Sequence, residues 1–115
     1  TNTSSKRTNL RTPSARLDEI GKGGLSGRAI SEKSTETIRK IRSITKGEKV
    51  IIGVGGISNT LDAIEKFKAG ADLIQLYTAL VYEGPSVVKK INKGLSRYLK
   101  ENSLEHIYHI RKIKD

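Results

Sequence analysis

The chain has 115 residues, the size of one modest domain, and a formal charge of +10 from 22 Lys and Arg against 12 Asp and Glu. The absence of cysteine excludes disulfides and thiolate chemistry. No apolar run is long enough to predict a membrane-spanning helix, and no secretion signal is recognisable. Because the first residue is Thr1 rather than a methionine, we expect a processed chain or the C-terminal part of a longer one.

The positive charge favours anionic partners such as nucleic acid, an anionic membrane surface, or phosphate and carboxylate ligands. The charged residues are dispersed between apolar positions, which is typical of solvated helix faces. RNA-binding surfaces usually add aromatic side chains for stacking, and here one Phe and four Tyr are scattered along the chain. We therefore predict no nucleic-acid partner.

Residues 4–33 form a polar leader with few apolar residues and a glycine cluster that ends at Gly27. Such long segments without periodicity are typically functional lids or disordered, and we predict a lid-like loop region. A helix is then predicted from an N-cap at Ser34 to a stop at Gly47. The isoleucines expected in its buried stripe are Ile38, Ile41 and Ile44.

The apolar run Val50–Val54 predicts a parallel strand that is covered on both faces. A second helix is predicted up to Gly70, followed by a second strand over Leu73–Tyr77 and a third helix that starts at Gly84-Pro85. The second helix has candidate caps at Ser58, Asn59 and Thr60 and a stripe of Leu61, Ile64 and Phe67; the third has an apolar face of Val88, Ile91, Leu95 and Tyr98. This alternation predicts an α/β fold with parallel βαβ units, cut from a longer series.

The glycine pair Gly55-Gly56, between the first strand and a helix, is the sharpest local motif. Glycine N–H groups and the helix dipole favour a bound phosphate, although the pair also fits a plain tight turn. Leu76-Tyr77-Thr78 ends the next strand, so it could share that phosphate or be an ordinary strand exit. The flexible segment 23–27 could close over a ligand, and Thr1-Asn2-Thr3 could project into a barrel mouth.

The basic tail carries His106 and His109 at a helical spacing, which we interpret as exposed residues rather than metal ligands. Its isoleucines, Ile107, Ile110 and Ile113, favour docking on the body of the protein over contact with an anionic membrane surface.

Over residues 1 to about 100 the chain resembles the class 2 (quinone-dependent) dihydroorotate dehydrogenases. The segments that carry the resemblance are Thr1-Asn2-Thr3, Gly23-Gly24-Leu25-Ser26-Gly27, Ile51-Ile52-Gly53-Val54-Gly55-Gly56-Ile57 and Gln75-Leu76-Tyr77-Thr78, with support from Ser34-Thr35-Glu36 and Ala69-Gly70-Ala71. The resemblance implies the C-terminal part of an FMN-binding (β/α)8 TIM barrel, comprising the end of strand six and strands seven and eight. Residues 101–115 would then be a separate basic tail.

The resemblance also implies oxidation of dihydroorotate to orotate in pyrimidine biosynthesis, with FMN as cofactor, a quinone as acceptor and a peripheral place on the cytoplasmic side of a membrane. It assigns FMN contacts to Thr1, Gly27, Gly55, Gly56, Tyr77 and Thr78, and contacts with the orotate ring to Asn2 and Thr3. Thr78 stands where many relatives carry Ser, a change that keeps the hydroxyl.

The catalytic Ser base of that family and its quinone-contacting N-terminal helices belong to a region upstream of Thr1. No catalytic residue is therefore assigned in these residues, and we expect them to be inactive alone. Two other functions stay open on the sequence. One is a different FMN- or phosphate-binding barrel enzyme, and the other is a small basic module that binds RNA or anionic lipid.

Overall fold

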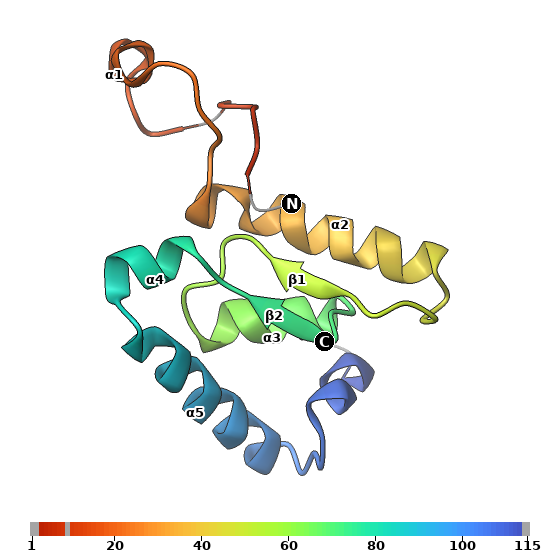
Figure 1. Ribbon diagram of the computed structural model, residues 1–115. Coiled ribbons are helices and arrows are strands. Elements are labelled where there is room, and N and C mark those ends of the chain that lie inside the picture. Colours follow the sequence, from red (N-terminus) through yellow and green to blue (C-terminus); the bar gives the residue numbers. More distant parts are fainter. Residues whose placement is uncertain (1–2, 9, 114–115) are drawn as a thin grey trace.

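The structure, a computed structural model, describes residues 3–8 and 10–113 as an α/β arrangement of helices and a pair of short strands (Figure 1). The elements in chain order are α1 (Ser14–Ile20), the 3-10 helix η1 (Gly27–Ile30), α2 (Ser31–Ile44), β1 (Ile52–Val54), α3 (Thr60–Lys68), β2 (Leu73–Gln75), α4 (Thr78–Glu83), α5 (Ser86–Glu101) and the 3-10 helix η2 (Ile107–Lys112).

The strands β1 and β2 are parallel, with Ile52 opposite Leu73. Helices α2 and α3 both approach β1 at Gly53, where a Cβ would lie 3.0 Å from Ile38 Cδ1 and 3.3 Å from Lys66 Cβ. Glycine suits this position because side chains of both helices would crowd a Cβ placed here. The Ser34 hydroxyl donates to the carbonyl of Val54, so β1 ends next to the first turn of α2, where the candidate site lies.

The strands are covered on one face only within the described residues, so the prediction of a first strand covered on both faces is wrong for this part of the chain. Ile52 is 53% exposed and Leu73 is 57% exposed, whereas the preceding Ile51 is buried. Alternate residues of a strand point to opposite faces. The helices thus cover one face, and the apolar residues of the other face lack cover.

The main core lies where α3 packs against α5 and η2. Its buried members are Ile57, Ala63, Ile64, Phe67, Ala79, Val87, Ile91, Leu95 and Ile110. The contribution of Ile110, which is fully buried, confirms that the tail docks on the body. The side chain of Arg111 also pairs with Asp72 at 2.5 Å, and Asp72 pairs with Arg42 of α2 at the same distance.

The first predicted helix differs from the observed α2 at its start. The helix begins at Ser31 with Ile30 in the N-cap position, so the assignment of Ser34 as the cap is wrong. The Ser34 hydroxyl instead donates to the carbonyl of Val54, a partner that no local pattern reveals. Of the predicted stripe only Ile38 is buried, and Ile44 is 80% exposed.

The two other predicted helices are present as α3 and α5, with two corrections. Asn59 is the cap of α3, in a capping box with Asp62, but Leu61 is exposed rather than part of the buried stripe. In α5 the buried residue of the first turn is Val87, and the predicted Val88 is exposed. No helix formed by the described residues is long and apolar enough to cross a bilayer.

Candidate functional site

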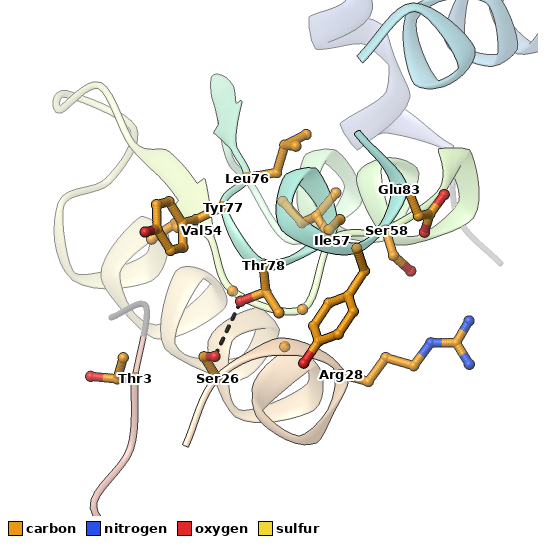
Figure 2. Close-up of a pocket in the computed structure, with 15 residues that line it drawn as sticks. Thr3, Ser26, Arg28, Val54, Ile57, Ser58, Leu76, Tyr77, Thr78 and Glu83 are labelled. Atoms are coloured by element: carbon orange, nitrogen blue, oxygen red, sulfur yellow. Dashed lines mark hydrogen bonds between the residues drawn. The ribbon is translucent and has the colours of Figure 1, made fainter. Parts of the chain in front are cut away.

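A cavity of about 530 Å³ lies at the carboxyl ends of β1 and β2, the edge where α/β proteins place their ligands (Figure 2). The leader, the loop after each strand, and α4 all contribute to its wall. The lining residues are Thr3, Ser26, Gly27, Arg28, Val54, Gly55, Gly56, Ile57, Ser58, Leu76, Tyr77, Thr78, Ala79, Tyr82 and Glu83.

The first wall is the glycine loop after β1, defined here as Gly55 and Gly56. Their φ angles are +112° and +72°, a region that residues with a Cβ rarely adopt. A Cβ on Gly56 would also lie 2.6 Å from Ser31 Cα and 2.9 Å from Ser31 N. The loop therefore rests directly on the backbone of the first turn of α2 and turns its own backbone toward the cavity.

The second wall is the exit from β2, where Thr78 starts α4. Its hydroxyl donates a hydrogen bond of 3.1 Å to Ser26 Oγ, and Figure 2 shows the two side chains pointing toward each other. The adjacent Gly27 has φ of +75°, and a Cβ there would lie 3.2 Å from Thr78 Cγ2. The end of the leader is thus seated against the end of the second strand.

The beginning of the leader reaches the same cavity. Ser4 and Leu25 form an antiparallel bridge through hydrogen bonds of 2.8 and 2.7 Å between their backbones. This bridge places Thr3 beside Gly24, where a Cβ would be 2.8 Å from Thr3 Cβ. Between these paired ends the leader carries α1, which none of the apolar patterns predicted and which has no buried residue (Figure 1).

The charge distribution modifies the expected phosphate site. The sequence suggested that the dipole of the helix after Gly56 would attract the anion, but Asp62 occupies the start of α3. Its carboxylate accepts hydrogen bonds from Ser58 N at 2.8 Å and from Asn59 N at 3.2 Å. By contrast, no side chain caps α4. The short α4, which the sequence reasoning missed, is therefore better placed to present free N–H groups.

The structure brings most of the predicted site residues together. Thr3, Gly27, Gly55, Gly56, Tyr77 and Thr78 all line the cavity, whereas Thr1 and Asn2 lie outside the described residues. Ser26 is a polar residue of the site that was not predicted. Its position within the Gly-Gly-Leu-Ser-Gly segment is the sequence feature that could have indicated it. Arg28 adds a cation and Glu83 an anion to the lining. The rings of His106 and His109 instead contact each other, with centroids 5.6 Å apart, in the docked tail.

A ligand cavity formed by glycine turns at the carboxyl ends of parallel strands is typical of α/β enzymes that bind phosphate groups. The sequence model of the family described as dihydroorotate dehydrogenase matches residues 1–99, and the chain belongs to that family. Similar curated proteins carry the name dihydroorotate dehydrogenase (quinone). The protein of Crocosphaera subtropica is 46% identical over 113 residues, covering 93% of this chain and 29% of its own length.

The mitochondrial dihydroorotate dehydrogenase (quinone) of Mus musculus is 48% identical over 85 residues, covering 74% of this chain and 22% of its own length. Among solved structures, the ligand-free DHODH of Eimeria tenella matches with a TM-score of 0.86 and 30% identity, covering 100% of this chain and 32% of that one. The complex of DHODH from the same organism with ferulenol has a TM-score of 0.80 and 34% identity, covering 97% of this chain and 28% of that one. The chain thus spans less than a third of the length of these relatives.

Proposed function

We propose that this chain is part of a flavoenzyme that oxidises dihydroorotate to orotate in pyrimidine biosynthesis, with FMN as cofactor and a quinone as electron acceptor. Membership of the family and the names of the relatives support the reaction. The observation that carries the proposal is the cavity itself, because it joins the glycine loop, the exit from β2 and both ends of the leader.

The FMN phosphate would be held by backbone N–H groups of the glycine loop and of Tyr77 and Thr78. The residues fit such a group because the glycine loop has positive φ angles and carries no side chain that could fill the cavity. Thr1 and Gly27 would contact the rest of the cofactor. Bound FMN would supply two-electron redox chemistry, and these residues would keep it in place.

Asn2 and Thr3 would hold the orotate ring, since an amide and a hydroxyl together offer donors and acceptors to its polar edge. The lid expected over residues 4–33 would end before η1, because Ile30 is buried and Ser31 already belongs to α2; the pairing of Ser4 and Leu25 lies at the base of this lid. We assign no catalytic base among these residues and expect the chain alone to be inactive.

In this proposal β1 and β2 are strands seven and eight of a (β/α)8 barrel, and residues 1–3 end strand six. The exposed Ile52 and Leu73 would then face the interior of that barrel, where layers of side chains from alternate strands form the core. The whole enzyme would be peripheral on the cytoplasmic side of a membrane, where a lipid-soluble quinone is available, and a region outside this chain would contact that quinone.

The test is to produce the protein from its natural reading frame and record its visible absorption. We expect flavin bands, release of FMN on denaturation, bleaching by dihydroorotate without air, and recovery on addition of a quinone. Residues 1–115 produced alone are the matched control and should show no turnover. A protein that neither retains FMN nor binds added FMN would refute the proposal.

A further inference from the structure

Lys66 of α3 is a lysine with no exposed surface, although the other basic residues were expected on solvated faces. Its ammonium donates hydrogen bonds to Ser31 O at 2.7 Å and to Thr35 Oγ1 at 2.6 Å. Both acceptors belong to the start of α2. The lysine therefore connects α3 to the N-terminal start of α2, which lies next to the candidate site.

This contact is costly for folding, because an ammonium loses its hydration when it is buried. Burial lowers the pKa of Lys66, and the nearby carboxylates of Asp62 and Glu65 only partly oppose that effect. The acceptors do not depend on the lysine, because Thr35 Oγ1 also donates to Ser31 O at 3.0 Å. An apolar side chain of the same length would leave these two groups bonded to each other, so stability alone does not explain a charge at this position.

The residue that Lys66 contacts, Ser31, also packs against the glycine loop. The backbone of Ser31 touches Gly56 so closely that a Cβ on the glycine would lie 2.6 Å from Ser31 Cα. One turn further along, the Ser34 hydroxyl donates to the carbonyl of Val54, the last residue of β1. The start of α2 therefore supports the glycine loop, and Lys66 fixes this support through its hydrogen bond to the carbonyl of Ser31.

We propose that Lys66 is a positioning residue for the glycine loop. Its ammonium fixes the start of α2 in the position in which Gly55 and Gly56, packed against it, present their N–H groups to the cofactor phosphate. Lys66 touches no part of the cavity and acts through Ser31. The inference rests on the proposed function, because it requires a phosphate ligand at this loop. Hydrogen bonds weaken steeply when their geometry changes, so a small shift of the start of α2 is sufficient to lower the affinity for FMN.

The test uses Lys66→Met in the protein from its natural reading frame, since methionine is close in length and carries no charge. We expect the dissociation constant for FMN to rise roughly tenfold, the equivalent of one impaired hydrogen bond to the phosphate. The urea midpoint of the FMN-free protein should stay the same or rise, because a buried charge has been removed. The KM for dihydroorotate should not change.

The matched control is Ile110→Ala, which opens a cavity where η2 packs against α3 and alters no residue that lines the candidate site. It should lower the urea midpoint and leave FMN affinity unchanged. A purely structural role of Lys66 predicts instead that Lys66→Met lowers the urea midpoint and the FMN affinity together. If Lys66→Met does not fold, Lys66→Gln tests the same contact by the same criteria.

Unchanged FMN affinity in a folded Lys66 variant would refute the positioning role and leave the proposed function standing. A wild-type protein that binds no FMN would refute the proposed function itself, and the role of Lys66 with it.

Discussion

The strongest prediction concerns Gly56, because two separate physical effects oppose any side chain at this position. The residue has φ of +72°, and its Cα faces the backbone of Ser31, which cannot rotate away as a side chain can. Substitution by alanine therefore strains the loop itself and pushes α2 away from β1. Gly84, between α4 and α5, also has φ of +72°, but nothing lies within 4 Å of a Cβ built there. Gly84→Ala is thus a control for the effect of a positive φ without a close neighbour.

The expected magnitudes follow from these contacts. A residue with a Cβ pays about 1–3 kcal/mol in these backbone regions, and Gly84, with ψ of 179°, lies in one that is essentially restricted to glycine; this is the whole penalty expected for Gly84→Ala. Overlap with a packed backbone adds about 1–3 kcal/mol, so Gly56→Ala should lower the free energy of unfolding by about 2–6 kcal/mol. Because Gly56 also belongs to the proposed phosphate site, its substitution should lower the amount of FMN retained on purification, and Gly84→Ala should not.

The assay is urea unfolding of both variants and the wild type, each in the FMN-free form, together with the flavin content of the purified proteins. A loss of stability in Gly56→Ala no larger than that in Gly84→Ala would show that Ser31 does not resist the added methyl group. That result would refute the close contact between the first turn of α2 and the glycine loop. Full retention of flavin by a folded Gly56→Ala protein would remove this residue from the phosphate site.

Two further predictions concern the packing of the tail. Burial disfavours the charged form of Asp72, but the Ile51 N–H and two arginines outweigh it and hold the pKa of this carboxyl below its usual range. Its contribution to stability is therefore fully present above the unfolded-state pKa of about 3.9 and is lost as the pH falls through the folded-state value. Asp72→Asn should cost about 2 kcal/mol at neutral pH in urea unfolding and flatten the decline in stability at acid pH; an unaltered acid profile would contradict the network. Ile110→Ala should cost about 3 kcal/mol in the same assay, because the residue is fully buried. The control Leu61→Ala, at a side chain 71% exposed, should change stability by no more than about 0.5 kcal/mol, and equal effects of the two substitutions would show that the tail does not dock.

The elements that the sequence predicted correctly are those with strong periodic or continuous apolar patterns. The helix around Ile38, both strands and the helix around Ile91 all carry such signals, and the structure contains each of them. The helices that were missed lack them. The helix α1 buries no side chain, so it has no apolar stripe. The helix α4 is short, and Leu76-Tyr77-Thr78 at its start reads as a continuation of the strand.

The candidate site was partly readable because glycine has a distinct backbone range. The glycines of the Gly55-Gly56 turn and of the leader segment 23–27 marked places where the chain turns sharply or approaches a neighbour. The positive φ angles of Gly27 and Gly56 agree with this interpretation. The partner of each glycine was not readable. Ser31 contacts Gly56 and Thr78 contacts Gly27, and no local pattern contains information about a residue so far along the chain.

The sequence by itself therefore determined the order of helices and strands, the family, and the segments from which the site is built, because these depend on local periodicity and on the residue types themselves. Only the tertiary structure decided which of those segments meet. It placed the leader against the exit from β2, directed the hydroxyl of Ser34 to the end of β1 rather than to a helix cap, and buried the side chain of Lys66 completely. The physical reason is that burial and hydrogen-bond partners depend on the element packed opposite, which the spacing of residues along one segment does not specify.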